Sequence, residues 1–568
     1  MKRDLQALAS QEFDVIVVGG GIARISVARD AALRGLSVAL VERDDFASGS
    51  TGHTSGMIHG GIRCLQRLDV GRLRALSAER NALLRNAPHL LHSVPIAVPT
   101  YGRGRDGKSA LHAGFGLYDF LTRRRNDGIA GASRRLPRSR TISRRAVLEM
   151  FPGLSEAGLT GAAIFTETQM HHPARLALAL LRSAVGGGAQ AANGLEATGF
   201  VRKGITVTGV GVRATKSGDS FVIHGRDVVN TAGAWAAHIL EEGLGLTLDP
   251  PLAFSRRLSF VVNRRPTHRI GLALLDESRD SLTPLSRSKH HLFMLPWRDH
   301  TVLGDWHREF AGTPDEIDVT DAEVETLVGE INERYPGLRL HPDEILRRNA
   351  TLGLLESRGS GTRRRRDAAQ ARLVDHAVVH GTRGIISLVG TTWGTARLDA
   401  VRVVDEVFRR NGKAPPPSRT STVPVYGGDL ESLETLVQEA HEAALPLGLR
   451  LARDQARALT RNHGSAYGEV FDIVREDRNL AACLPGTRVL KAEIVHAVRM
   501  EMAMTLDDVV HRRTDLGLGT LLEPALEEAA YLMGVELGWS PDRVRRELAE
   551  VTSRPGGESP AAAEYAHA

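Results

Sequence analysis

The stretch "DVIVVGGGIARIS", residues 14–26, constrains the fold of this chain more than any other segment. Residues 13–18, "FDVIVV", form a short apolar and β-branched run, which is typical of a buried parallel strand. The glycines lead into a segment with helical spacing of apolar residues, and "SVALVERDD" (37–45) predicts a second strand ending in acidic residues. A strand, a glycine turn, a helix and a second strand within about 30 residues predict a dinucleotide-binding βαβ unit.

Two glycines and one acidic residue of this unit suit a bound dinucleotide. Gly19 allows the tight turn after the strand, and Gly21 lets the backbone approach a pyrophosphate at the helix N-terminus. Glu42, at the end of the second strand, is placed to accept hydrogen bonds from an adenosine ribose. Its charge disfavours the 2′-phosphate of NADP.

Arg24 stands where the fingerprint has a third glycine, whose role is to let the helix pack closely on the sheet. A side chain at this position is expected to cost about 1–3 kcal/mol, by weakening helix–strand packing or cofactor binding. On this steric hypothesis, Arg24→Gly tightens cofactor binding or raises thermal stability.

Two later segments repeat the order of apolar strand, glycine turn and helix. They are "DVVNTAGAWAAHIL" (227–240) and "GIISLVGTTWGTARLDAVRVVDEVF" (384–408). Units so far apart predict one α/β cofactor domain with a Rossmann-like fold, interrupted by a β-rich substrate domain. Within the substrate domain, "RLSFVVNRR" and residues 290–306 have strand-like composition, with Arg298–Asp299 as a hairpin turn.

Changes in composition give the expected domain boundaries. Residues 430–550 are rich in Leu, Ala, Glu and Arg at helical spacing and predict a separate helical domain, within which 489–513 is a long amphipathic segment. The chain is expected to divide into an oxidoreductase domain (1–412), a proline-rich linker (413–428), the helical domain (429–552) and a disordered tail (553–568). In the first domain, the cofactor part covers about 12–85, 150–250 and 345–412, and the substrate part about 86–149 and 251–344.

Composition and charge limit the classes of function. With 568 residues, of which 42% are hydrophobic and 25% charged, the chain is typical of a globular protein with several domains. The net charge of +6 favours anionic partners. The arginine-rich stretches 122–127, 133–145 and 362–367 are interpreted as solvated loops, or else as contacts with a membrane surface or an anionic substrate. Nucleic acid is not expected as a partner, because no recognition module accompanies the charge.

The cysteines and histidines predict neither a disulfide framework nor a metal site. Cys64 and Cys483 are far apart in the sequence, and the adjacent His171 and His172 lack the usual spacing of metal ligands. We recognise no export signal and no apolar run of membrane-spanning length. A cytoplasmic protein is therefore expected, either soluble or peripheral at the inner face of the cell membrane.

Several segments, in order along the chain, resemble the FAD-dependent glycerol-3-phosphate dehydrogenases of the D-amino-acid-oxidase-like superfamily. "SGSTGHTSGMIHGGIRCLQ" (48–66) resembles the flavin-contacting segment, "VVNTAGAWA" a second flavin motif and "LPWRDHTVLGDWH" the substrate-domain hairpin. "LKAEIVHAVRMEMAMTLDDVVHRRTDLG" resembles the C-terminal helical cap domain. The resemblance covers nearly the whole chain. It implies a divergent FAD-dependent oxidoreductase with a glutathione-reductase-type cofactor domain.

The resemblance also implies a reaction and a set of site residues. Glycerol 3-phosphate, or a related secondary alcohol, is oxidised by hydride transfer to flavin N5, and electrons then pass to a quinone or to oxygen. His59, Arg63 and Arg397 are expected to be the catalytic residues. His59 has a proton role, Arg63 holds the substrate phosphate, and Arg397 closes the last flavin motif beside the flavin. A homodimer in contact with the membrane is compatible with the resemblance. The residues expected to bind FAD are Gly19, Gly21, Ile22, Glu42, Arg43, Ser50, Thr51, Thr54, Ser55, Ala232, Gly233, Trp235, Gly390, Thr391, Thr392 and Trp393.

Some positions depart from the family pattern, mainly on the substrate side. Thr392 stands where the family has a lysine, and the segment around Leu354 lacks a further substrate arginine. Losing two such charged contacts is expected to weaken phosphate binding by about a hundredfold or more. Two alternatives therefore stay open: oxidation of another alcohol, amine or hydroxy acid, and a catalytically weak or non-enzymatic descendant. The other replaced positions are Gly56, Cys64, Phe260 and Gly394.

Overall fold

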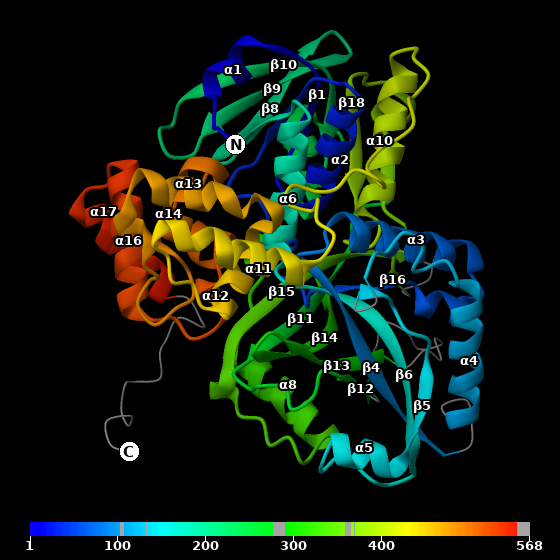
Figure 1. Cartoon of the computed structure of the whole chain (residues 1–568). Helices are drawn as coiled ribbons and strands as arrows, with labels where there is room; N and C mark the ends of the chain where they lie inside the picture. Colours follow the sequence, from blue (N-terminus) through cyan, green and yellow to red (C-terminus); the bar gives the residue numbers. More distant parts are fainter. Residues whose placement is uncertain (103–106, 132–133, 277–289, 358–364, 369, 554–568) are drawn as a thin grey trace.

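Two β-sheets and a C-terminal group of helices make up the molecule (Figure 1). The structure is a computed structural model that describes residues 1–102, 107–131, 134–276, 290–357, 365–368 and 370–553. The beginning of the arginine run at 362–367 and nearly all of the tail expected to be disordered lie outside the described residues.

The first sheet has eight strands, among which β18, β10, β1, β2 and β7 lie in this order and run parallel. On β1, Val15 and Val17 pack on one face while Ile16 and Val18 pack on the other. Both faces are buried, which explains the unbroken apolar run of the sequence. The strands are β1 (Glu12–Val18), β2 (Val38–Val41), β7 (Gln190–Ala192), β8 (Leu195–Lys203), β9 (Thr206–Ala214), β10 (Ser220–Asn230), β17 (Arg372–Asp375) and β18 (Ile385–Val389).

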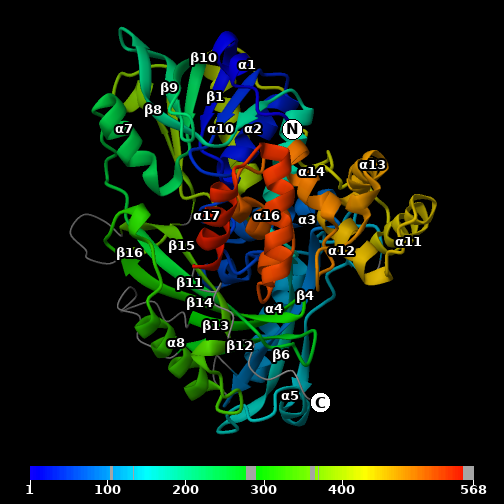
Figure 2. The same cartoon turned by 90° about the vertical axis from the view of Figure 1, so that its left-hand side faces the viewer.

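Helices and a small antiparallel extension cover the two faces of this sheet (Figures 1 and 2). Helices α2 (Ile22–Leu33), α6 (Pro173–Gly186) and α10 (Ala396–Arg410) share one apolar core with Val15, Val17 and Leu40. The other face packs against β9, α1 (Leu5–Ser10) and α7 (Ala236–Leu244). The βαβ unit predicted from residues 13–45 is therefore confirmed.

The second sheet has ten strands, and helix α8 (Asp321–Arg334) packs on one of its faces. Val324 and Leu327 of α8 share a core with Phe260 and Trp306 of the sheet. The hairpin predicted at Arg298–Asp299 is present between β13 and β14. The strands are β3 (Met57–Ile58), β4 (Leu91–Tyr101), β5 (Arg140–Ser143), β6 (Leu159–Met170), β11 (Phe254–Val262), β12 (Gly271–Asp276), β13 (His290–Trp297), β14 (His300–Phe310), β15 (Ile345–Ser357) and β16 (Arg365–Asp367).

The second sheet takes two strands that the sequence analysis placed in the cofactor part. β6 pairs with β4, and β15 pairs with β11, so both belong to the second sheet. Alternation and composition predict that a segment is a strand, but pairing partners far away in the sequence decide which sheet it joins. Helices α3 (Val70–Asn86), α4 (Lys108–Leu121) and α5 (Arg144–Met150) complete this half of the chain (Figure 1).

The middle of the proline-rich linker is anchored on helix α2. Arg29 donates hydrogen bonds to the carbonyl oxygens of Thr420 at 3.3 Å and Val423 at 2.7 Å. Ser418 donates to Asp30 at 2.5 Å, and Thr420 is buried. The linker therefore fixes the helical region against the first sheet instead of acting as a free tether.

The C-terminal region is helical, as predicted, and it packs beside α6 (Figure 1). The amphipathic segment expected at 489–513 is interrupted, because Met502 adopts a left-handed φ of +57° after α14. A π-helical turn, Val509–Arg513, then follows α15. Among the described residues, no helix combines the length and the apolar character needed to cross a membrane. The helices are α11 (Leu433–Ala444), α12 (Arg453–His463), α13 (Gly468–Glu476), α14 (Lys491–Glu501), α15 (Leu506–Asp508), α16 (Glu523–Leu537) and α17 (Pro541–Thr552).

Candidate active site

The glycine turn between β1 and α2 forms one end of a long cavity. Gly19 has a φ of +108°, in the region that favours glycine, and Gly21 precedes α2 without any side-chain cap. The Thr51 hydroxyl accepts a hydrogen bond from the Ile22 N–H at 2.9 Å. Backbone N–H groups at the positive end of a helix dipole form a site suited to anions.

Glu42 lies beside this turn, at the end of β2. Its carboxylate accepts hydrogen bonds from the backbone N–H of Gly20 and, at 2.9 Å, from that of Asp44. Burial raises the pKa of Glu42, and the positive charge of Arg24 opposes this rise. These contacts hold the carboxylate at the mouth of the anion site, where hydroxyl groups of a ribose can reach it.

The cavity has a volume of about 1600 Å³ and extends from the glycine turn to the second sheet. Every residue predicted to bind the cofactor lines it, although these residues come from three distant parts of the sequence. The indole N–H of Trp393 donates to the Thr51 carbonyl oxygen at 3.2 Å, and the Leu352 N–H donates to the Ser50 hydroxyl at 3.3 Å. These contacts hold the segment 48–55 between the two sheets.

His59 and Arg63 come after this segment in the sequence. They line the end of the cavity that lies away from the glycine turn. The Nδ1 atom of His59 lies 4.0 Å from Oε1 of Glu167, and 51% of the His59 side chain is exposed to the cavity. Glu167 is itself buried, pairs with Arg80 at 2.6 Å and accepts a hydrogen bond from the Gly60 N–H at 2.9 Å. This buried ion pair fixes the backbone that carries His59.

Three residues of the second sheet, which the sequence analysis did not single out, reach the same end of the cavity. They are Arg257 on β11 and Asp305 and His307 on β14. The Nε2 atom of His307 lies 3.2 Å from Oδ2 of Asp305. Burial alone would raise the pKa of Asp305, but His307, Arg257 and Arg63 together hold it far below its usual value. The only feature of the sequence that could have pointed to these three residues is that they are polar or charged residues within predicted strands.

The comparisons with known proteins agree with this geometry. The family described as FAD dependent oxidoreductase matches residues 14–398, and the C-terminal domain of alpha-glycerophosphate oxidase matches residues 418–544. A glycerol-3-phosphate dehydrogenase 1 of Mycobacterium tuberculosis is 31% identical, over 91% of this chain and 93% of that protein. The chain belongs to the FAD-dependent glycerol-3-phosphate dehydrogenase family. A glycerol-3-phosphate dehydrogenase of Synechocystis is also similar, at 27% identity over 91% of both chains.

A solved structure of another family member shares the fold. The glycerol-3-phosphate dehydrogenase of Bacillus halodurans, complexed with FAD, aligns with a TM-score of 0.73 and 23% identity, over 96% of this chain and 94% of that chain. The alpha-glycerophosphate oxidase of Mycoplasma pneumoniae aligns with a TM-score of 0.51 over 73% of this chain and 99% of its own. These alignments support the fold, and the two family matches confirm the predicted FAD-dependent oxidoreductase domain and C-terminal domain.

The residues around the glycine turn of this FAD-dependent oxidoreductase fit a dinucleotide, with one exception. The bare glycines, the Glu42 carboxylate and the long cavity are suited to FAD. The exception is Arg24, whose guanidinium lies over Gly19 and Gly21, where Cβ atoms would collide with it. The expectation that this side chain disturbs the packing of α2 on β1 is wrong, because it extends over the turn and Ile25 fills the inner face of the helix.

Arg397 differs from its predicted role because it does not line the cavity. Its guanidinium binds Glu79 on α3, with Nε donating to Oε2 at 2.9 Å. It therefore joins α10 to α3 rather than meeting the substrate. The position opens a helix, and a sequence motif does not tell toward which neighbour a long side chain turns.

Most positions at which this sequence departs from the family pattern lie in the cavity, and one lies in the core. Thr392, Leu354, Cys64 and Gly394 line the cavity. Phe260 does not, since it packs against Trp306 on the opposite face of the sheet, with ring centroids 5.3 Å apart. The loss of a histidine at Phe260 therefore removes nothing from this site. Arg257 supplies a guanidinium near Gly353, where an added Cβ would lie 2.8 Å from its Nε atom.

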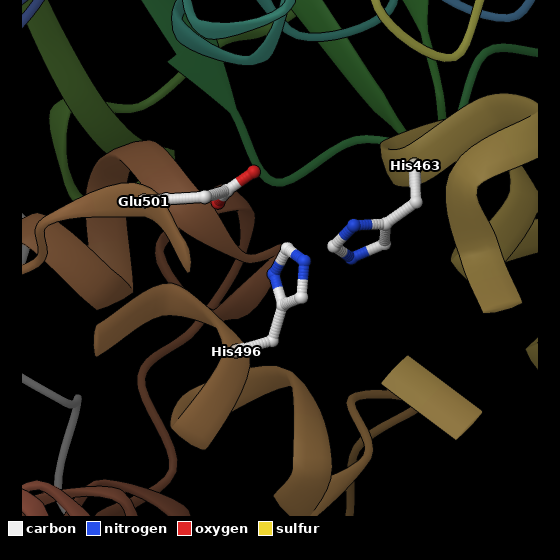
Figure 3. A group of neighbouring side chains, drawn as sticks. All are labelled: His463, His496 and Glu501. Carbon is white, nitrogen blue, oxygen red and sulfur yellow. The ribbon is translucent and has the colours of Figure 1, made fainter. Parts of the chain in front are cut away.

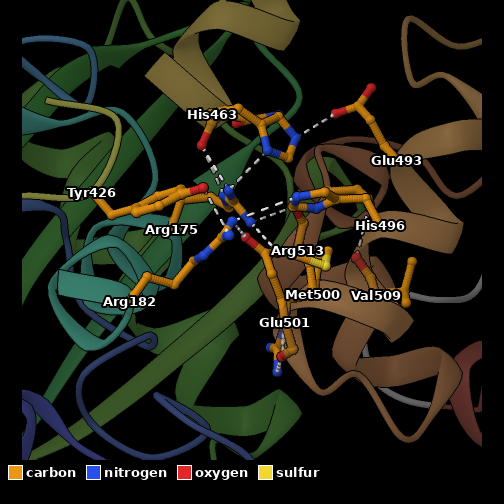
Figure 4. A network of polar contacts seen from close by, with 12 residues as sticks. Arg175, Arg182, Tyr426, His463, Glu493, His496, Met500, Glu501, Val509 and Arg513 are labelled. Atoms are coloured by element: carbon orange, nitrogen blue, oxygen red, sulfur yellow. Dashed lines mark hydrogen bonds and ion pairs between the residues drawn. The ribbon is translucent and has the colours of Figure 1, made fainter. Parts of the chain in front are cut away.

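A buried polar network joins helix α6 to the C-terminal helices (Figure 4). Arg175 pairs with Glu501 at 2.5 Å and donates to the Asn462 carbonyl oxygen at 2.7 Å. Arg182 lies over the Tyr426 ring at 3.7 Å and pairs with Glu469 at 2.8 Å. These contacts place the helical domain against the cofactor-binding half, a placement that no local pattern predicts.

The same network contains the one group of side chains among the described residues whose ligand atoms lie close enough together to hold a metal ion. These are His463, His496 and Glu501 (Figure 3). Two guanidinium groups already hold the Glu501 carboxylate, with Arg182 at 3.6 Å in addition to Arg175. A divalent cation placed there would be repelled by both of these charges. The arrangement is therefore that of an ion-pair network.

A second buried group fixes the helical domain beside the cavity. Arg513 binds Asp45 through two hydrogen bonds of 2.7 Å, and Arg512 adds a third at 2.5 Å. Burial would raise the pKa of Asp45, but the two arginines outweigh it and bring the pKa to about 2. Asp45 lies four residues after the end of β2, so this contact ties the segment that follows the cofactor-binding strand to the π-helical turn.

Proposed function

We propose that this FAD-dependent oxidoreductase oxidises the secondary hydroxyl of glycerol 3-phosphate and releases dihydroxyacetone phosphate. The observation that carries the proposal is the convergence of Arg63 and Arg257, two cavity-lining arginines from different elements that both act on Asp305. Guanidinium groups hold phosphates through forked N–H donors. The names of the relatives, glycerol-3-phosphate dehydrogenases, support the same substrate.

His59 is proposed to accept the proton of the substrate hydroxyl. Its position inside the protein lowers its pKa, with Glu167 opposing and Arg63 adding to the effect, so the imidazole is neutral at pH 7. The Arg80–Glu167 pair holds the backbone of this segment in place. The predicted cavity-lining set, from Gly19 to Trp393, is proposed to hold FAD, which when bound supplies the hydride acceptor.

Asp305 favours a second candidate function, the oxidation of a substrate with less negative charge. Its carboxylate lies beside the two arginines and neutralises part of their charge. A small hydroxy acid or an amine-bearing acid matches such a mixed set of charges better than a phosphate dianion does. His307, held at 3.2 Å from Asp305, adds a further polar contact at this end of the cavity.

Anaerobic reduction of the purified, FAD-loaded enzyme tests both candidates. The flavin absorbance is followed after adding glycerol 3-phosphate, glycerol, a hydroxy acid or an amino acid. Glycerol 3-phosphate should bleach the flavin about tenfold faster than glycerol or more, because glycerol lacks the phosphate that the two arginines are proposed to bind. Faster bleaching by the hydroxy acid or the amino acid would establish the second candidate instead.

We further propose a quinone or oxygen as electron acceptor, a cytoplasmic location at the membrane surface and a homodimer. Helix α4 supports the membrane contact, since Leu117 and Phe120 are exposed beside Arg123 and Arg124. Sedimentation with anionic vesicles tests it, and Leu117→Gln with Phe120→Gln should abolish binding. Equal sedimentation of the variant and the wild type would contradict this contact. Steady-state rates with a soluble quinone and with oxygen distinguish the two acceptors.

A further inference from the structure

The Arg24 side chain spans the space between two glycine turns. Its guanidinium lies over Gly19 and Gly21 in the first turn. Its Nη2 atom reaches the turn after β10, where a Cβ added to Gly233 would lie 3.2 Å away. Both turns line the end of the cavity next to the glycine turn of β1 and α2, which we call the cofactor end. Arg24 therefore occupies the region that the bare glycines leave open for a diphosphate.

The charge of Arg24 is poorly balanced where it lies. Its Nε atom is buried and has no hydrogen-bond partner among the described residues. Glu42, the carboxylate that acts on it, is engaged with the backbone N–H groups of Gly20 and Asp44. The positive end of the α2 dipole, at Gly21, makes a cation still less favourable there. Burial lowers the pKa of Arg24 to about 10, which leaves it charged at pH 7.

We propose that Arg24 is a ligand of the FAD diphosphate, whose oxygens accept hydrogen bonds from its guanidinium. A diphosphate brings the negative charge that both the guanidinium and the helix N-terminus lack. Only the far end of a flexible side chain has to shift to admit it. This inference concerns the cofactor end of the cavity and holds whichever substrate the enzyme oxidises.

The opposite possibility is that Arg24 merely obstructs the turn. An obstructing side chain would be held there by contacts of its own, whereas the Nε atom of Arg24 has no hydrogen-bond partner among the described residues. The two possibilities predict opposite effects of removing the guanidinium. Obstruction predicts tighter FAD binding, and the ligand role predicts weaker binding.

Titration of the apoprotein with FAD separates them. Arg24→Met should raise the dissociation constant of FAD about 10- to 100-fold, the effect expected for losing a charged hydrogen bond. Arg24→Lys keeps the charge but loses the fork, so its affinity should lie between those of the wild type and Arg24→Met. Arg202→Met, an exposed arginine of β8 outside the cavity, is the matched control and should bind FAD like the wild type.

Two smaller probes show whether the effect comes from the phosphates. Arg24→Met should weaken ADP binding in the same proportion as FAD binding, and should leave adenosine binding unchanged. Equal losses for ADP and adenosine would mean a structural role and would overturn the proposal. Unchanged or tighter FAD binding by Arg24→Met would overturn it as well. If Arg24→Met does not fold, as judged by thermal unfolding of the apoprotein, Arg24→Gln and Arg24→Lys carry the comparison, and wild-type affinity in both overturns the proposal.

Discussion

Arg257 and His307 are directly opposite each other on the antiparallel strands β11 and β14. Both line the end of the cavity that also holds His59 and Arg63, which we call the substrate end. Both also act on the carboxylate of Asp305. Arg257→Met should therefore raise KM for glycerol 3-phosphate about 10- to 100-fold, with a smaller change in kcat. Steady-state kinetics with purified holoenzyme measure both constants.

The neighbouring Arg256 gives a matched control for this variant. It binds Glu323 on α8, on the opposite side of the strand, and does not line the cavity. Arg256→Met should lower stability but leave KM unchanged. A similar rise of KM in both variants would show that the effect of Arg257 is not a phosphate contact.

His59 should determine the acidic limb of the pH–rate profile. Because the pKa of His59 is lowered from its ordinary value of 6.5, kcat/KM should fall only below pH 6.5, as the imidazole becomes protonated. His59→Asn should lower kcat about 10²- to 10⁴-fold and remove this limb. Measurements across pH 5–9 with His59→Asn and with His224→Asn, an exposed histidine on β10, provide the test. An unchanged limb in His59→Asn would assign the proton to another group.

Arg397 should contribute to stability rather than to substrate binding. Its partner Glu79 is buried, so Arg397→Met leaves a buried carboxylate without its guanidinium and should lower the free energy of unfolding by about 1–3 kcal/mol. KM should stay within about twofold of the wild type. Urea denaturation and steady-state kinetics check the two parts, and Arg397→Met with Glu79→Gln should recover part of the lost stability. A rise of KM at unchanged stability would restore the catalytic role.

Asp45 should make stability depend on pH in the acid range. Its folded pKa of about 2 lies below the ordinary value of 3.8, so the arginine contacts stabilise the fold above pH 4 and are lost as the pH falls toward 2. Asp45→Asn should lower the free energy of unfolding by about 3–5 kcal/mol at pH 7, since Arg512 and Arg513 remain buried. Asp44→Asn, the exposed neighbouring residue, is the control and should change stability little. Equal values for the two variants from urea denaturation would contradict this account.

The fold could be predicted in large part from local patterns. The apolar strand at 13–18, the glycine turn and Glu42 predicted the βαβ unit, because a strand buried on both faces and a backbone that approaches a phosphate need these residue types. The motif segments also predicted which residues line the cofactor end of the cavity. The structure places all of them there.

Other features could not be predicted, because they depend on contacts between segments far apart in the sequence. The sequences of strands β6 and β15 do not indicate which sheet they join, and only their partners assign them to the second sheet. Arg257, Asp305 and His307 carry no motif, and they meet because the register of β11 and β14 puts their side chains at one end of the cavity. The network around Glu501 is equally invisible in the sequence, since its members come from residues 175 to 501.

The family, the cofactor and the positions of the glycine turns follow from the amino-acid sequence alone, since they depend on residue types at short spacing. Where the long charged side chains end depends on contacts that exist only in the folded chain. Arg24 covers the glycine turn, Arg397 binds Glu79, and Arg257 reaches the substrate end of the cavity. The reason is that an arginine has several rotatable bonds, and the place of its guanidinium is set by partners that folding brings together.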